Sequence, residues 1–357
     1  MSPLTKRNTR SRWSLGRQTR WRVFVARVRG FRAHMKVRMQ LVHILFVLLI
    51  APFNVAAQKF SSLDLTLKLA QDRAYLSVKT DWIAVEEEAQ LRALNQGEDA
   101  AIKFVLKSLG DRHSFYRPAA KPVFRPPLAT NLKTANYTAP TIVRTLFEVK
   151  EPIYGVPVLK INGWSGIQQD AMIVTSTLRL ALINELSKSP CGIILDFSEN
   201  TGGNMWPMLI GLSPLLTEGI VGYFKYASGT VKAIEKKSSG IFIQGSRHVL
   251  NDASTLEPIN QAQFIAIVVG ANSASSGEIV PIMFHGQKNV RLFGQRTFGV
   301  PTVNSTFKLP NGGFANITTG VTLDRNNNLF ETHIDPEIET RQPLKDAAMW
   351  GLEQCQS

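Results

Sequence analysis

The feature that most constrains the fold is a regular alternation of strand-like and helix-like segments from residue 154 onward. Short apolar runs and longer helical patterns follow one another in this order: 155–163, 172–188, 191–198, 205–216, 264–270 and 275–287. Strands separated by helices pair in parallel, and the helices cover the sheet. The sequence therefore predicts an α/β protein whose core contains a parallel-rich sheet.

Two other regions flank this core. Helical patterns at 64–78, 81–94 and 100–110 predict a small N-terminal helical region. Residues 290–327 are β-rich and contain a hairpin signal at Asn311. We therefore expect four parts. Residues 1–57 form a leader and residues 58–110 a helical region. Residues 111–153 form a loop followed by a Pro-rich flap (117–140), and residues 154–357 form the core.

The leader explains the net charge of +14. Residues 1–57 hold 12 Lys and Arg and no Asp or Glu, which leaves 29 basic against 27 acidic residues in the rest of the chain. A basic excess confined to a leader argues against nucleic-acid binding. From Met35, a basic stretch, an apolar run (41–51) and the small residues up to Ala57 match a secretory signal peptide.

The leader predicts export to the bacterial periplasm or cell envelope, with cleavage after Ala57. The apolar run is shorter than the roughly 20 residues that span a bilayer, although retention as a membrane anchor stays open. Cys191 and Cys355 are the two cysteines, and in an oxidising compartment they either form one disulfide or remain two thiols.

Two strand-to-helix turns place polar groups where α/β proteins bind ligands. The first contains Gly202 and Gly203, whose amides are candidates for an oxyanion hole, although such a turn is also an ordinary flexible connection. The second contains Ser275, Ser276 and Glu278. It reads either as a capping box or as a nucleophilic serine at a helix N-terminus.

A serine nucleophile needs a base, and four histidines follow the leader. His285 falls at the far end of the helix that begins after Ser275, where it suits the helix dipole, and His248 and His333 stand in polar, loop-like surroundings. His113 lies in a loop close to the aromatic residues Phe115 and Tyr116, directly before the flap. It is either a packed spacer or a general base beneath a lid.

Three segments together resemble the carboxy-terminal processing (tail-specific) protease family: GIILDFSENTGGNMWPM (192–208), NSASSGEIV (272–280) and GQRTFGVPTVNSTFKLPNGG (294–313). The resemblance implies a ClpP/crotonase-like core and a serine peptidase that uses neither a cofactor nor a metal. It places the nucleophile on Ser275 and a matching acid on Glu278.

Many family members carry a lysine base 25 residues after the serine, but this chain has Val300 there. The departure points to the nisin-resistance branch of the family, which uses a histidine in an HSF-type segment, and His113 matches that residue. No room remains between His113 and Tyr154 for a PDZ domain, so we expect the flap to replace it. DFSEN (196–200) also departs from the common family pattern.

These observations predict cleavage of peptides or unfolded protein tails through an acyl-enzyme. His113 activates Ser275, while the amides of Ser276, Gly202 and Gly203 bind the oxyanion. Glu278 supports the turn rather than forming a triad, and the residue that orients His113 is not identifiable from the sequence.

Substrate contacts are expected from the start of the helix that follows the first turn, although core packing explains these residues equally well: Asn204, Met205 and Trp206. Two alternatives remain. One is a protein of the same fold that binds apolar ligands or peptides without cleaving them, and the other is a membrane-tethered scaffold.

Overall fold

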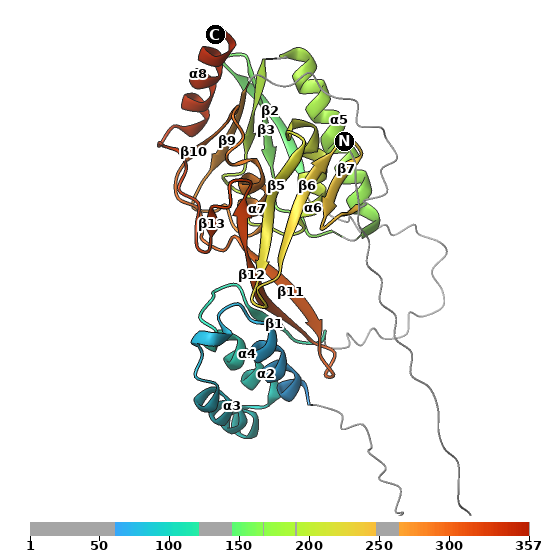
Figure 1. The fold of residues 1–357 in the computed structure, drawn as a ribbon, viewed down its shortest axis with the longest axis vertical. Coiled ribbons are helices and arrows are strands. Elements are labelled where there is room, and N and C mark those ends of the chain that lie inside the picture. Colours follow the sequence, from blue (N-terminus) through green and yellow to red (C-terminus); the bar gives the residue numbers. More distant parts are fainter. Residues whose placement is uncertain (1–60, 121–144, 167, 190, 248–263, 357) are drawn as a thin grey trace, which may run out of the picture. The chain divides into compact units, whose positions relative to one another are not determined.

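The computed structural model describes residues 61–120, 145–166, 168–189, 191–247 and 264–356 (Figure 1). The chain divides into two units, Met1–Lys59 and Phe60–Ser357, and the first lies wholly outside the described residues. The predicted signal peptide, most of the flap and His248 therefore also lie outside them.

The core sheet has six strands in the order β14-β10-β9-β4-β3-β2. Its strands are β2 (Phe147–Ile153), β3 (Val156–Ile161), β4 (Gly192–Asp196), β9 (Phe264–Val269), β10 (Val290–Gly294) and β14 (Ile338–Glu339). All neighbours pair in parallel except β2, which pairs antiparallel to β3. The predicted parallel-rich sheet and the α/β fold class are confirmed.

Helices cover both faces of this sheet. They are α5 (Gln168–Lys188), α6 (Met205–Leu212), α7 (Ser276–Phe284) and α8 (Pro343–Gln356), with a short helix η2 (Ser213–Leu215) after α6. In β9, Ile265 and Ile267 point into the core shared with α5, α6 and α7, whereas Phe264 and Ala266 point toward α8. A strand buried on both faces reads as a continuous apolar run, which is what the sequence shows.

A second, antiparallel sheet has the order β1-β12-β5-β6-β7-β8, with β11 and β13 also paired to β12. Its strands are β1 (Phe115–Arg117), β5 (Gly219–Tyr226), β6 (Val231–Lys237), β7 (Gly240–Ile243), β8 (Ser246–Arg247), β11 (Thr302–Lys308), β12 (Phe314–Asp324) and β13 (Leu329–Phe330). The β-rich C-terminal part is confirmed, and Asn311 lies in the turn between β11 and β12.

The N-terminal helices are α2 (Ser62–Arg73), α3 (Trp82–Gln96) and α4 (Glu98–Ser108), with a short helix η1 (Ser77–Lys79) after α2. They share a buried core with Ala315 and Ile317 of β12. The first helix ends at Arg73 rather than near residue 78, because the Tyr75 amide donates to the Thr318 carbonyl of β12 at 2.8 Å. A tertiary hydrogen bond therefore ends a helical pattern that continues in the sequence.

Cys191, beside the start of β4, and Cys355, in the last turn of α8, form a disulfide with their Cα atoms 5.8 Å apart. The sequence left open whether these cysteines pair, and the structure shows that they do. The disulfide ties the C-terminal helix covalently to the core sheet. The pair lies next to the buried cluster under α8.

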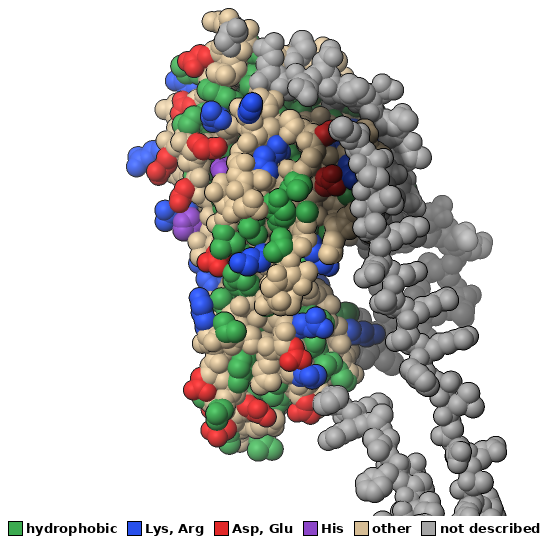
Figure 2. All heavy atoms as spheres, in the orientation of Figure 1, with side chains coloured by type: hydrophobic (Ala, Val, Ile, Leu, Met, Phe, Trp, Pro, Cys, Tyr) green, Lys and Arg blue, Asp and Glu red, His purple; other side chains and the backbone are tan. Residues whose placement is uncertain are grey.

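The surface carries charges of both signs. On the face shown in Figure 2, Lys and Arg side chains lie among Asp and Glu side chains. Within the described ranges, no helix combines the length and the apolar character that crossing a bilayer requires. The predicted absence of a nucleic-acid partner stays a prediction.

Candidate active site

The two predicted turns lie at the same edge of the core sheet because β4 and β9 are parallel neighbours. The Ala274 amide donates to the Asn200 carbonyl at 2.9 Å, and the Ser276 hydroxyl donates to the Gly203 carbonyl at 2.6 Å. A Cβ at Gly277 would lie 2.1 Å from the Asn200 oxygen, so only glycine permits this approach. The two turns therefore form one packed unit.

Ser275 has a strained backbone, with φ 55° and ψ −116°, directly before α7. Such a conformation costs a non-glycine residue about 1–3 kcal/mol and persists only where the surroundings impose it. Gly202 (φ 102°) provides the space, because a Cβ there would lie 2.9 Å from the Ser275 Cβ. A sharp, strained strand-to-helix turn of this type is how α/β hydrolases present a nucleophilic serine.

The capping interpretation of the second turn is confirmed, because both halves of a capping box between Ser275 and Glu278 are present. The Ser275 amide donates to Glu278 Oε2 at 2.9 Å. The Glu278 amide also donates to the Ser275 carbonyl at 2.8 Å. Ser275 remains partly exposed, so the cap is compatible with a nucleophilic role.

Glu278 is fully buried and accepts four hydrogen bonds. Oε1 accepts from the Thr297 hydroxyl (2.5 Å) and the Gly299 amide (2.9 Å), and Oε2 accepts from the amides of Ser275 and Val300 (both 2.9 Å). Burial raises the pKa of Glu278, and these donors oppose that shift. The carboxyl thus fastens the segment 297–302 to the Ser275 turn, which agrees with its predicted supporting role.

His113 lies in the loop between α4 and β1, and Asp111 shapes this loop. Asp111 Oδ1 accepts from the amides of His113 (2.9 Å) and Ser114 (2.6 Å), and Oδ2 accepts from the Ser114 hydroxyl (2.6 Å). The His113 ring contacts Thr302 of β11, with Nδ1 and Oγ1 2.7 Å apart. Burial lowers the pKa of His113, and the Asp111 charge partly opposes this. The lowered pKa favours the neutral imidazole, which is the form a general base needs.

The segment 297–302 connects the two halves of the site. Glu278 holds one end of it to the Ser275 turn, and Thr302 at the other end contacts His113. In between, the Phe298 amide donates to the Ser273 carbonyl at 2.9 Å.

Arg112 adds a further tie to this segment. Its Nη2 donates to the Phe298 carbonyl at 2.7 Å, and its guanidinium lies 4.9 Å from the centre of the Phe298 ring. No hydrogen bond joins His113 directly to Ser275 among the residues that the structure describes. Their direct contact stays a prediction.

The predicted oxyanion hole needs one correction. The Gly202 amide donates to Asn200 Oδ1 at 2.9 Å, so it is not a free donor. The amides of Gly203 and Ser276 have no acceptor within the described part of the chain. Ser276 is also the first residue of α7, where the helix dipole favours negative charge. These two amides are the remaining candidates.

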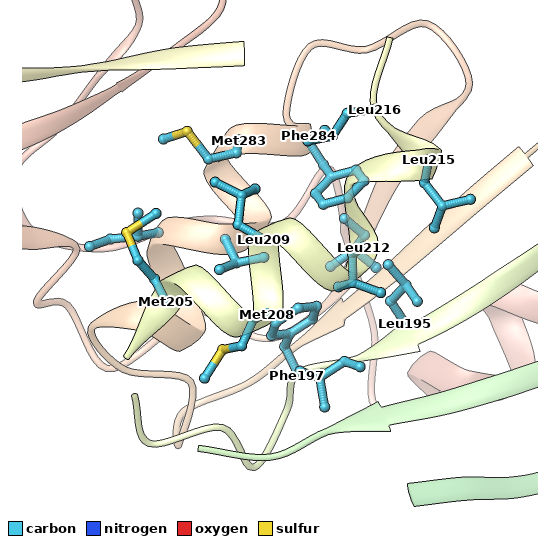
Figure 3. Close-up of a cluster of buried hydrophobic side chains, with 14 of the residues drawn as sticks. Leu195, Phe197, Met205, Met208, Leu209, Leu212, Leu215, Leu216, Met283 and Phe284 are labelled. Atoms are coloured by element: carbon cyan, nitrogen blue, oxygen red, sulfur yellow. The ribbon is translucent and has the colours of Figure 1, made fainter. Parts of the chain in front are cut away.

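The predicted substrate residues have structural roles. Met205 is 7% exposed and packs with other α6 side chains in the hydrophobic core, and its contact with substrate stays a prediction (Figure 3). Asn204 caps α6, since its Oδ1 accepts from the Trp206 amide at 3.1 Å. Asn204 and Trp206 are only partly buried, and their contact with substrate stays a prediction.

Two of the other histidines have partners of their own. His285 is the C-cap of α7, as the sequence predicts, and its Nδ1 lies 2.7 Å from Oδ2 of the buried Asp324. His333 contacts Thr332, and its Nε2 lies 3.4 Å from Asp335 Oδ2. Neither joins the hydrogen bonds that hold the Ser275 turn.

Two cavities of about 380 and 390 Å³ flank the turn between β5 and β6, and both are lined by Asp72, Tyr226 and Ala227. Neither lining includes Ser275 or His113. Over the described residues, no group of three or more His, Cys, Asp or Glu side chains is arranged to hold a metal ion.

Sequence reasoning missed the residues that join the site together. Thr302 is 189 positions from His113, and Asn200 and Thr297 reach the Ser275 turn only through the fold. Arg112 is adjacent to His113, but nothing in its sequence context indicates that it stacks on Phe298. No local pattern in the sequence could have identified these contacts.

The chain is similar in sequence and in fold to known proteins. The chain is 32% identical over 160 residues to the nisin-resistance protein of Lactococcus lactis subsp. lactis, a match that covers 44% of this chain and 49% of the relative. The chain thus spans about half the length of the curated relative it matches.

Among solved structures, a lipoprotein from Streptococcus agalactiae is similar with a TM-score of 0.66 and 24% identity, over 82% of this chain and 96% of that chain. This likeness shows a shared fold. The photosystem II D1 C-terminal processing protease reaches a TM-score of 0.49 with 11% identity, over 78% of this chain and 92% of its own.

The family model of peptidase family S41 matches residues 157–340, just over half of the chain. The match runs from β3 to the residue after β14, and it contains both turns and the segment 297–302. The resemblance stated from the sequence is confirmed. A family model that covers just over half of the chain shows that the chain belongs to peptidase family S41.

Proposed function

We propose that this protein is a serine endopeptidase that cleaves peptides or unfolded protein tails near their C-terminus through Ser275 and His113. The observation that carries the proposal is the strained conformation of Ser275 at the edge of the sheet. Strain of this kind is retained where function requires it. A serine that only capped a helix would take an ordinary extended conformation.

The proposed reaction begins with proton transfer. Neutral His113 removes the proton of Ser275 as the Ser275 oxygen attacks the carbonyl carbon of the scissile peptide bond. The amides of Gly203 and Ser276 donate to the oxyanion that forms. His113 then gives its proton to the leaving amine, and water hydrolyses the acyl-enzyme by the same steps.

The histidine is the base in this proposal because the lysine position of the wider family is not available. Val300 occupies it, and Val300 is 4% exposed with its amide bound to Glu278. Burial lowers the pKa of His113 and so favours the neutral form that a base needs.

We further propose that the protein is exported to the cell envelope. The signal-like leader supports this, and so does the Cys191–Cys355 disulfide, because disulfides persist in oxidising compartments. The solved structure described as a lipoprotein agrees with the same location. N-terminal sequencing of the mature protein from the producing cell tests this, and a start near Gln58 is the expected result. Recovery of the intact leader in the cytoplasm would reject it.

The reaction is tested with the wild-type protein, Ser275→Ala and His113→Ala. Each is incubated with unstructured peptides that vary at their C-termini and with nisin, because a relative is named for resistance to it. A fluorophosphonate probe, which labels activated serines without a peptide substrate, is followed by mass spectrometry. We expect labelling of Ser275 in the wild type, none in Ser275→Ala and slow labelling in His113→Ala.

Matched controls separate the site from general damage. Ser228→Ala and His333→Ala change the same residue types on exposed or half-exposed loops and should leave labelling and cleavage unchanged. If wild type and both site variants cleave nothing and label alike, the protein is not a peptidase. The non-catalytic binding function then replaces this proposal.

A further inference from the structure

The His113 ring has one hydrogen-bond partner among the described residues, which is the Thr302 hydroxyl 2.7 Å from Nδ1. Its Nε2 has no partner there. Thr302 is 7% exposed and is the first residue of β11, paired with Val321 of β12. A buried hydroxyl on a paired strand therefore meets one ring nitrogen, and the other nitrogen is left available.

The hydrogen bond between His113 and Thr302 has two directions. If Nδ1 carries the proton and donates to Thr302 Oγ1, the Nε2 lone pair can accept a proton from a nucleophile. If Thr302 donates to Nδ1, the proton sits on Nε2, which is then a half-buried donor without an acceptor in the described part of the chain. The first arrangement pairs the ring N–H and leaves the Thr302 O–H without an acceptor in the described part of the chain, and the second arrangement does the reverse. Only the first leaves Nε2 free to act as the base, so the proposed function favours it.

Asp111 does not compete for this role. Its two carboxylate oxygens accept from backbone amides and from the Ser114 hydroxyl within the loop. It acts on the ring through its charge, which favours the protonated form of His113. In a Ser-His-Asp triad one carboxylate both orients the histidine and stabilises its charge. Here the Thr302 hydroxyl contacts the ring, and the Asp111 carboxylate stabilises its charge.

Thr302 is itself held by the anchor that fixes the nucleophile. Two residues before it, the Val300 amide donates to Glu278 Oε2, the oxygen that also accepts from the Ser275 amide. Between them, the Pro301 carbonyl accepts from the Thr322 hydroxyl of β12 at 2.7 Å. A shift of Glu278 would therefore move both Ser275 and the partner of His113.

We propose that Thr302 is the positioning residue of the active site, which fixes the His113 ring with its proton on Nδ1 and its Nε2 free to act as the base. The catalytic part of this inference rests on the proposed function. The tautomer itself is measured on the folded protein without any assay of activity.

The test compares wild type with Thr302→Val, which removes the hydroxyl while keeping the side chain's shape, and Thr302→Ser, which keeps the hydroxyl. The protein is labelled with ¹⁵N-histidine, and His113→Ala identifies the resonances of His113. In wild type and Thr302→Ser we expect the shifts of an Nδ1-protonated ring. In Thr302→Val we expect a mixture of both tautomers.

Kinetics with a cleaved peptide give the second measurement. Losing one hydrogen bond to the ring should lower kcat about 3- to 10-fold, with KM within about twofold, and Thr302→Ser should restore most of it. Thr306→Val is the matched control, because Thr306 lies on the same strand and its hydroxyl binds Asn316 instead. It should change neither the His113 resonances nor kcat.

Unchanged His113 shifts in Thr302→Val would overturn the proposal, as would a Thr302→Ser variant that behaves like Thr302→Val. If the wild type cleaves no peptide, the proposed function fails while the resonances of His113 still decide the role of Thr302. The two failures are therefore distinguishable.

Discussion

Replacing Glu278 by glutamine is the most demanding test of how the site is held together. The two side chains have nearly the same shape, but glutamine has one acceptor oxygen where glutamate has two. Each Glu278 oxygen accepts two hydrogen bonds in the structure. In either orientation of the amide, two donors that now bind an oxygen would face an NH₂ group.

The expected magnitude follows from these contacts. A buried donor left without an acceptor costs about 1–3 kcal/mol, so two such donors cost about 2–6 kcal/mol. Glutamine also removes the cost of burying a charge, which is the cause of the raised pKa of Glu278. Because this second effect offsets part of the first, we expect Glu278→Gln to lower the free energy of unfolding by about 2–4 kcal/mol.

Urea unfolding measured by circular dichroism gives the difference, read as a lower midpoint at an unchanged slope. Glu353→Gln makes the same chemical change on the exposed side of α8 and should stay within about 0.5 kcal/mol of wild type. Peptidase activity should fall with stability in Glu278→Gln, because Ser275 and the segment 297–302 lose their common anchor. A Glu278→Gln protein with wild-type stability and activity would refute this account of the site.

Three further predictions follow from single features. Ser275→Gly should be more stable than Ser275→Ala by about 1 kcal/mol in urea unfolding, because glycine relieves the strain at φ 55°; equal midpoints would mean that the turn is unstrained. The Cys191–Cys355 disulfide closes a loop of 164 residues, so the Cys191→Ser/Cys355→Ser double variant should lose about 2–5 kcal/mol in the same assay, and an unchanged midpoint would count against the bond. Asp111→Asn removes the charge that raises the pKa of His113, so the acid limb of kcat/KM, which tracks loss of the neutral base, should move to lower pH; a move to higher pH would contradict the assigned effect of Asp111.

The site divides into residues with a local signature and residues without one. The Ser275 turn, the glycine turn, Glu278 and His113 were predicted because each stands in a short segment that resembles a family motif, since local chemistry alone left an alternative open at each turn and at His113. The sequence was least decisive where one residue could serve either packing or binding. The structure places Met205 in the core, and an apolar side chain at the start of a buried helix suits either role.

The fold shows the same division. Alternating apolar and helical runs predicted the parallel core, because period and length are properties of consecutive residues. The strands β5 to β8, between residues 219 and 247, were not predicted. They alternate only weakly, and their stability comes from pairing with one another and with β12, almost one hundred residues further along the chain.

The sequence by itself determined the fold class, the family and the identity of the candidate nucleophile and base, since all of these follow from short segments whose residues are close in the chain. Only the tertiary structure decided the rest. It paired Cys191 with Cys355, took the Gly202 amide out of the oxyanion hole and brought Thr302 to His113. Each of these is a contact between specific atoms, whose distance depends on how strands and turns pack and not on the order of residues.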